Sequence, residues 1–238
     1  MSCGSIEGTL SLVTQMKIYP EEFRLVLLSM LDKLMHLFDE HDVEYTMCGG
    51  SLLGCCRSGK FIPFDYDGDV ELLPGNGNRK RFFTMVNYVK THGVETRLTV
   101  TTTHLPSLVK FSPAVTMRVY QALQFDRADV PNPTWDVFIL EGSSEIGFKI
   151  VRNSWPKWRY LPGEMYPITK RPFEGRMVPT AAHPKGILKR YYGDDFMTPK
   201  YYKWPDCSGN AKHRNAREAD YAAVIAKHVL KNKATLPM

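Results

Sequence analysis

The 238-residue sequence contains no Cys-x-x-Cys pair, no long uninterrupted apolar run and no leader-like start. Its five cysteines include the adjacent Cys55 and Cys56, a spacing that fits neither a zinc ribbon nor a disulfide framework. The most apolar stretch, residues 23–38, is interrupted by charged residues, which excludes a membrane span there. The opening residues lack the basic and apolar regions of a signal peptide. We therefore expect a protein with no membrane span, in a reducing compartment such as the cytoplasm.

The composition excludes two further classes of protein. With 43% hydrophobic and 24% charged residues, 17 Gly and 16 Pro, the chain is neither disordered nor of low complexity. Its net charge of +6 is uneven, because residues 149–203 hold 12 Lys or Arg against 4 acidic residues, interleaved with Trp and Tyr. Such a segment suits a phosphorylated or glycan acceptor, and it also resembles a groove for single-stranded nucleic acid. Alternatively, the aromatic residues are core and the basic residues are a solvated face.

The order of expected elements favours one α+β domain. The pattern shows no internal repeat and no linker, so we assign residues 1–238 to a single domain, with a core over 20–140 and a C-terminal extension over 141–238 packed on it. Helices are expected over 20–41, 52–57, 78–93, 184–192 and 216–232. Strands are expected over 43–47, 65–73, 94–121 (two or three) and 134–140, with a hairpin at Glu174-Gly175.

The most informative segment is an alternation of acidic residues. On a strand the alternation places four carboxylates on one side: Asp65, Asp67, Asp69 and Glu71. Neighbouring charges about 6 Å apart would repel by roughly 3 kcal/mol, a cost that a divalent cation would reverse. The alternative is a solvated edge strand whose charges discourage aggregation. An EF-hand is excluded, because the positions that require glycine and glutamate hold Val70 and Asn76.

A small-residue turn precedes this acidic strand. Gly49, Gly50 and Ser51 follow one predicted strand and precede a predicted helix, where backbone N–H groups can approach an anion. A glycine turn by itself is a weak signal. Together with an acidic strand shortly downstream, it describes a phosphate-binding turn facing a carboxylate-bound metal, which is the layout that phosphoryl or nucleotidyl transfer requires.

A third carboxylate ligand is expected from elsewhere in the chain. Asp136 is the best candidate, because it is a lone charge near the start of an otherwise apolar run over 135–140. A buried aspartate is costly unless it is paired or bound to a metal. The alternative is an aspartate at a strand end that bonds to the backbone.

These segments together resemble the signature of the LicD family, which includes fukutin and fukutin-related protein. The similar blocks, in chain order, are GGSLLG at 49–54 with Arg57, FIPFDYDGDV at 61–70, WDVFIL at 135–140, FEGRMVP at 173–179 and LKRYYGDDFMTP at 188–199. The resemblance covers most of residues 20–204. It implies a nucleotidyltransferase-type mixed sheet flanked by helices, with an irregular C-terminal elaboration.

The resemblance also implies an activity. Members of the family transfer a phospho-alcohol, such as phosphocholine or ribitol phosphate, from a CDP-activated donor to a sugar, polyol or glycan hydroxyl and release CMP, with Mg²⁺ or Mn²⁺ as cofactor. Carried over by position, the implied metal ligands are Asp67, Asp69 and Asp136, and the implied catalytic acids are these three with Asp65. The implied phosphate-binding residues are Gly49, Gly50, Ser51 and Arg57. Between Asp65 and Asp136 as the general base, the sequence does not choose.

Two positions depart from the family pattern. Gly68 replaces the usual Ile or Val, and Phe64 replaces the usual Trp, which would loosen the strand or alter the packing of the donor. Two rival functions remain open. One is a nucleotidyltransferase that uses an NTP on RNA or a small molecule, although a nucleic-acid partner is the less expected. The other is a catalytically silent binding domain of the same fold.

Overall fold

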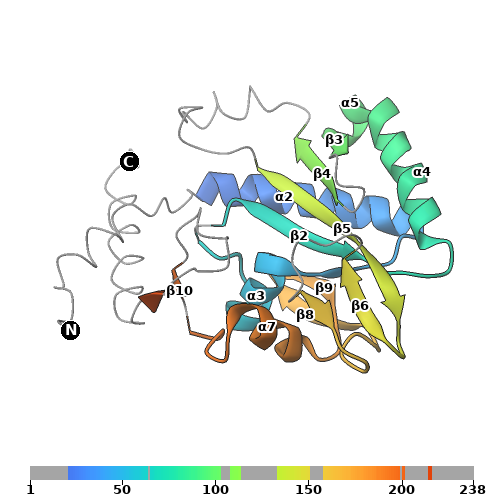
Figure 1. Ribbon diagram of the computed structural model, residues 1–238. Coiled ribbons are helices and arrows are strands. Elements are labelled where there is room, and N and C mark those ends of the chain that lie inside the picture. Colours follow the sequence, from blue (N-terminus) through green and yellow to red (C-terminus); the bar gives the residue numbers. More distant parts are fainter. Residues whose placement is uncertain are drawn as a thin grey trace, which may run out of the picture. The chain divides into compact units, whose positions relative to one another are not determined.

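The computed structural model describes residues 21–63, 65–102, 108–113, 133–150, 158–198, 200–201 and 214–215 (Figure 1). The chain divides into two compact units, Tyr19–Tyr191 and a unit made of Met1–Ile18 with Tyr192–Met238. In the latter, strands β10 (Lys200–Tyr201) and β11 (Arg214–Asn215) pair antiparallel. Phe64 and the helix expected over 216–232 lie outside the described residues. Within the described ranges, no helix combines the length and apolarity that crossing a bilayer needs.

A mixed sheet forms the centre of the Tyr19–Tyr191 unit. Its strands run in the order β1 (Tyr45–Met47), β2 (Asp67–Leu72), β5 (Thr134–Ser143), β4 (Leu108–Pro113) and β3 (Leu98–Thr102). Strands β6 (Gly147–Ile150) and β7 (Arg159–Tyr160) extend it from the end of β5. Strands β2 and β5 pair parallel and the other pairs are antiparallel. The α+β class with a mixed sheet is therefore confirmed, and the edge-strand interpretation is wrong, because β2 lies between β1 and β5.

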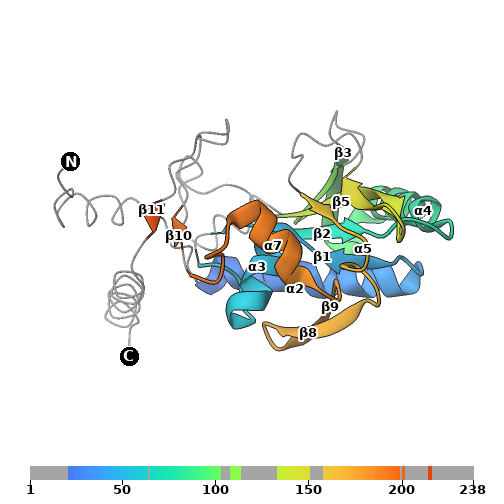
Figure 2. The same ribbon diagram turned by 60° about the horizontal axis from the view of Figure 1, so that its bottom comes forward.

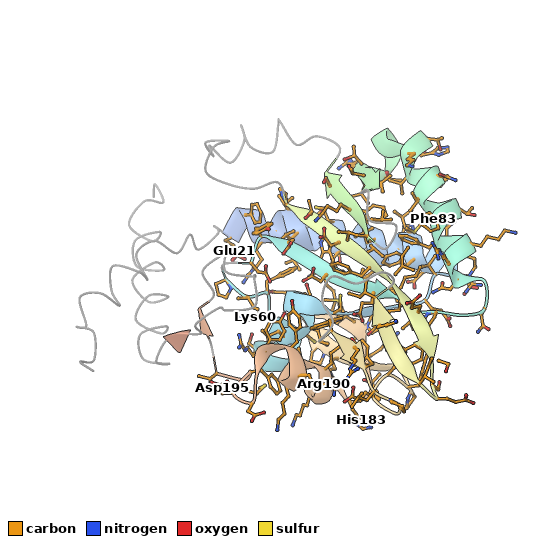
Figure 3. The ribbon with its side chains drawn as sticks, viewed as in Figure 1. Glu21, Lys60, Phe83, His183, Arg190 and Asp195 are labelled. Carbon is orange, nitrogen blue, oxygen red and sulfur yellow. The ribbon has the colours of Figure 1, made fainter. Side chains whose placement is uncertain are left out.

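Two helices cover one face of this sheet. Helix α2 (Glu21–Glu40) has buried apolar side chains at helical spacing: Phe23, Leu27, Met30, Leu31, Leu34, Leu37 and Phe38. The indole Nε1–H of Trp135 on β5 donates to the Leu27 carbonyl of α2 over 2.9 Å. Helix α4 (Asn78–Thr91) packs Phe82 edge-on against Phe111 of β4. Side chains fill the layer between these helices and the sheet (Figure 3).

The opposite face of the sheet carries the acidic side chains. Helix α3 (Gly49–Ser58) contacts β2. The hairpin of β8 (Thr169–Phe173) and β9 (Arg176–Thr180) packs beside the edge strand β1, where it contacts α3 and also binds α2 through Arg176 and Asp32 (Figure 2). Helix α7 (Pro184–Tyr192) follows this hairpin, at the bounds that the sequence predicts. The predicted hairpin at Glu174-Gly175 is likewise confirmed. The elements around the acidic side chains therefore come from both sides of residue 140, where the expected core ends: α3 precedes it, and β8, β9 and α7 follow it.

Strand β2 begins at Asp67 rather than at residue 65, and β5 ends at Ser143 rather than at residue 140. Two further differences lie next to a glycine. Helix α3 begins at Gly49 rather than at residue 52, so the predicted turn is the first turn of the helix. Residues Gly93–Thr96 form the short helix α5 instead of the start of a strand, and β3 begins at Leu98. Both helices begin at a glycine, Gly49 or Gly93. A glycine in the sequence indicates that one element ends near it, but it does not show whether the glycine belongs to the turn or to the next element.

Candidate functional site

The register between β2 and β5 brings three carboxylates together. Asp69 lies directly beside Asp136 in the parallel pairing, and Asp67 lies two residues before Asp69 on the same face of β2. One carboxylate oxygen from each of these residues lies within 4.8 Å of the other two. We call Asp67, Asp69 and Asp136 the acidic triad. The three residues predicted as metal ligands are thus neighbours, although 67 positions separate Asp69 from Asp136 in the chain.

The surroundings of the acidic triad disfavour negative charge. Burial raises the pKa of Asp69 well above its usual value, and the nearby Asp67 and Asp136 carboxylates raise it further. Burial also raises the pKa of Asp67 and of Asp136. Asp136 Oδ1 is buried and has no hydrogen-bond partner among the described residues. Three converging carboxylates with an unsatisfied oxygen fit a hard divalent cation such as Mg²⁺ or Mn²⁺, which prefers oxygen ligands.

The first turn of α3 is tied to the acidic strand. The Gly50 N–H donates to Asp69 Oδ2 over 2.9 Å, and the Asp69 N–H donates to the Ser51 hydroxyl over 2.9 Å. A Cβ atom at Gly49, whose φ is +52°, would lie 2.4 Å from Asp69 Oδ2. Only residues without side chains allow this close approach. The Gly50 and Ser51 groups predicted to bind phosphate are therefore engaged with Asp69: the Gly50 N–H orients its carboxylate, and the Ser51 hydroxyl accepts from its backbone N–H.

The remaining predicted residues lie at two places around α3. Asp65 precedes β2, and a Cβ atom at Gly50 would come within 2.2 Å of its Oδ2. Burial, followed by the charges of Asp67 and Asp69, raises the pKa of Asp65 well above normal, and Asp65 shares a side-chain hydrogen bond with Asp67. Arg57 lies in the last turn of α3. Its backbone is about 10 Å along the helix axis from Gly50, so the predicted phosphate contact of Arg57 stays a prediction.

The structure adds Lys110, which sequence reasoning missed. Lys110 on β4 stands opposite Asp136 in the antiparallel β4–β5 register, and its Nζ forms an ion pair with Asp136 Oδ2. Its side chain is 35% exposed, so the ammonium group sits at the border between the acidic triad and solvent. The signal in the sequence was a lysine between the apolar residues Val109 and Phe111, but only the strand pairing shows which carboxylate it meets.

Glu71, the last acid of the alternation, is not part of the acidic triad. It faces the same side of β2 as Asp67 and Asp69, and it is fully buried, accepting a hydrogen bond from Trp158 Nε1–H. Burial raises the pKa of Glu71 to about 8, against smaller lowering effects of Trp158 and the Tyr160 hydroxyl. Glu71 is therefore a neutral, structural carboxylic acid around pH 7, held by the hydrogen bond from Trp158.

The variant Glu71→Gln is expected to flatten the dependence of stability on pH. The native Glu71 keeps its proton up to about pH 8, whereas the unfolded carboxyl loses it near 4.5. The native state therefore holds the extra proton between these values, and the free energy of unfolding falls as the pH rises. This contribution is at most about 5 kcal/mol. Glutamine keeps the shape and the acceptor for Trp158 but does not titrate.

Thermal unfolding of both proteins with EDTA between pH 5 and pH 8.5 measures this effect. The stability of Glu71→Gln relative to the wild type should increase over that range. Glu141→Gln makes the same change at an exposed position of β5 and should give a constant difference from the wild type. A constant difference for Glu71→Gln as well would contradict the assignment of a buried neutral acid.

The basic segment predicted over 149–203 falls partly outside the described residues. In the described part, Trp158 and Tyr160 are buried, which makes these two aromatic residues core and not a stacking surface. Arg176 binds Asp32 of α2 through two hydrogen bonds, and Arg190 binds Glu164. Four lysines of the described part are exposed, of which Lys149 pairs with Glu141: Lys149, Lys170, Lys185 and Lys189.

A known protein family is similar to this chain across the candidate site. The chain matches the family model described as LicD/FKTN/FKRP, nucleotidyltransferase domain, over residues 42–183. No curated protein matches it. Lincosamide antibiotic adenylyltransferase LnuA, bound to lincomycin, is similar at 12% identity, covering 64% of this chain and 78% of that chain, with a TM-score of 0.37. An antigenic nucleotidyltransferase-like protein from Paracoccidioides brasiliensis is similar at 12% identity over 91% of both chains, with a TM-score of 0.41. The family match spans every part of the candidate site, from the first turn of α3 to Asp136.

Proposed function

The chain belongs to the LicD/FKTN/FKRP family of nucleotidyltransferase domains, and on this premise we propose that it is a metal-dependent transferase of phospho-alcohols. The donor would be a CDP-activated alcohol, such as CDP-choline or CDP-ribitol, and the acceptor a hydroxyl of a sugar, polyol or glycan. The observation that carries the proposal is the acidic triad, in which three buried or half-buried carboxylates converge and Asp136 Oδ1 has no hydrogen-bond partner in the described part of the chain.

Asp67, Asp69 and Asp136 would hold the divalent ion. Mg²⁺ or Mn²⁺ bound there would withdraw charge from the donor diphosphate and so favour departure of CMP. The chain's own residues have supporting roles. The Gly50 N–H holds the Asp69 carboxylate in one orientation, so that it need not be ordered when the site fills, and the Ser51 hydroxyl fixes the Asp69 backbone N–H.

Asp65 is the better candidate for the general base. The oxygen of the acceptor hydroxyl would attack the phosphorus atom that carries the alcohol, the P–O bond to CMP would break, and the hydroxyl proton would pass to a carboxylate. Asp136 would already be engaged as a ligand in the acidic triad. Asp65 lies outside the triad, and its raised pKa makes its carboxylate a stronger proton acceptor than an ordinary aspartate.

Product analysis tests the proposed reaction. The wild-type protein is incubated with CDP-choline, CDP-ribitol or CDP-glycerol, with Mg²⁺ or Mn²⁺, and with a panel of sugars and polyols. We expect CMP release with at least one donor, dependent on the metal and on an acceptor. Pyrophosphate release from an NTP, with RNA or a small molecule as acceptor, would instead indicate a nucleotidyltransferase. No turnover, with thermal stability unchanged by metal and CDP-alcohols, would indicate a silent binding domain.

A further inference from the structure

Lys110 is the cation that the chain itself supplies to the acidic triad. Its Nζ pairs with Asp136 Oδ2, and its charge lowers the pKa of Asp67 and of Asp69 against the larger raising effect of burial. Lys110 therefore acts on all three carboxylates from a strand, β4, that contributes no carboxylate to the triad. Its ammonium group offsets part of the negative charge of the acidic triad.

The two oxygens of Asp136 differ in their partners. Oδ2 is paired with Lys110, and Oδ1 is buried without a hydrogen-bond partner among the described residues. A divalent ion held by the triad would draw on the same carboxylate and would repel the ammonium group. At about 4 Å and an effective dielectric constant of 20, even two single charges interact by roughly 4 kcal/mol. The ion and Lys110 therefore compete for Asp136.

Lys110 can move when a divalent ion displaces it from Asp136. Its side chain is 35% exposed and ends in a compact charge on a flexible four-carbon stem. The stem lies on the face of the sheet that carries the triad, so a short displacement keeps the ammonium group at the site. The donor diphosphate would bring negative charge to that place, and phosphate oxygens accept hydrogen bonds from ammonium groups.

We propose that Lys110 exchanges partners during binding: it neutralises the acidic triad while no divalent ion is bound, and it moves to a phosphate oxygen of the nucleotide when the ion takes Asp136. This inference rests on the proposed function, because it assumes a metal-bound nucleotide diphosphate at the triad. Lys110 would thus weaken metal binding at the triad through its charge, and it would bind the nucleotide once the metal is in place.

The charge-removing variant Lys110→Met tests both halves without any turnover. Thermal unfolding of the protein during a titration with Mn²⁺ alone gives the metal affinity. Removing the competing charge should make Mn²⁺ bind roughly tenfold more tightly, since even a small part of the Coulomb energy amounts to a factor of ten. At saturating Mn²⁺, the affinity for CDP as the nucleotide probe should instead fall, by roughly tenfold. Opposite shifts of the two affinities are not expected from a merely structural role.

Matched variants separate charge from packing. Lys110→Arg keeps the charge and should bind Mn²⁺ and CDP nearly as the wild type does. Lys149→Met removes a lysine from an exposed ion pair with Glu141 on β5 and should change neither affinity. Glu141 is five residues from Asp136 along the strand, about 17 Å away. Lys110→Gln, which keeps a hydrogen-bond donor, replaces Lys110→Met if the latter does not fold.

The outcomes distinguish this inference from the proposed function. Wild-type Mn²⁺ affinity in the charge-removing variant, or tighter Mn²⁺ binding with unchanged CDP affinity, would overturn the partner exchange even if the wild type releases CMP. A wild-type protein that binds neither Mn²⁺ nor CDP would overturn the proposed function and the inference together. Tighter Mn²⁺ and weaker CDP binding in Lys110→Met, with wild-type behaviour in Lys110→Arg, would support the exchange.

Discussion

Replacing Asp67 with asparagine is expected to lower the rate of CMP release by roughly a thousandfold or more, because the acidic triad loses a charged ligand. Asparagine has the shape of aspartate but no negative charge, and it leaves two carboxylates to hold the ion. Folding should survive the change. Burial raises the pKa of Asp67, so its charge is already unfavourable in the native state without a metal, and the neutral amide removes that cost.

Two measurements distinguish loss of chemistry from loss of structure. CMP release is measured with the donor that the wild type uses best, and thermal stability is measured with and without Mn²⁺. The variant should unfold at or above the wild-type temperature without metal, and Mn²⁺ should stabilise it less. Asp42→Asn is the matched control, because Asp42 is exposed and its φ of 52° suits asparagine. CMP release at the wild-type rate by Asp67→Asn would contradict the metal assignment.

Replacing Gly68 with valine, which is usual at this position in the family pattern, is expected to destabilise the fold by about 3 kcal/mol or more. Gly68 on β2 stands beside Trp135 on β5 in the parallel register. A Cβ atom at position 68 would lie 2.4 Å from Cε2 of the indole ring. Trp135 is fully buried and bonded to the Leu27 carbonyl, so its ring cannot move aside without losing that hydrogen bond.

A second substitution tests this size relationship. Trp135→Val makes room for the new side chain, and Gly68→Val with Trp135→Val nearly conserves the total volume. Denaturant unfolding of the two single variants and the double variant gives the coupling free energy. We expect the double variant to be more stable than the sum of the single effects predicts, by about 1 to 3 kcal/mol. Additive effects would show that Trp135 does not fill the space above Gly68.

This pairing also gives the Gly68 departure a physical cause. Gly68 faces α2 and the core, on the side of the sheet away from the acidic triad, since side chains alternate along a strand. The structure therefore gives a packing reason for glycine at this position, and an effect on donor packing stays a prediction. Gly68 makes room for Trp135 on the neighbouring strand. Asp67 and Asp69, on either side of Gly68, still face the opposite side of the sheet.

Local patterns predicted much of the fold and of the candidate site. The helix expected over 20–41 is α2, and the acidic alternation lies on β2 with Asp67 and Asp69 on one face. Asp136 was found because a lone charge in an apolar strand needs a partner. These inferences succeed because the backbone geometry of a helix or strand determines which side chains share a face, and the residues involved are close in sequence.

Other predictions depended on strand register and on packing between distant segments. Asp69 meets Asp136 because β2 and β5 pair parallel, and Lys110 meets Asp136 because β4 pairs antiparallel with β5. The alternation placed Glu71 with the triad, but Trp158, from a segment 87 residues away, holds it as a buried neutral acid. Sequence periodicity contains no information about which strands become neighbours.

The sequence by itself determined which groups are available to the candidate site: the acids of one strand, the glycines of the preceding turn and a later aspartate in an apolar strand. The tertiary structure decided what each group does. It turned the Gly50 N–H and the Ser51 hydroxyl toward Asp69, and it supplied Lys110 as a counter-charge. The physical reason is that residue type and local backbone geometry determine which groups are available, whereas strand register and burial determine their partners and their charge.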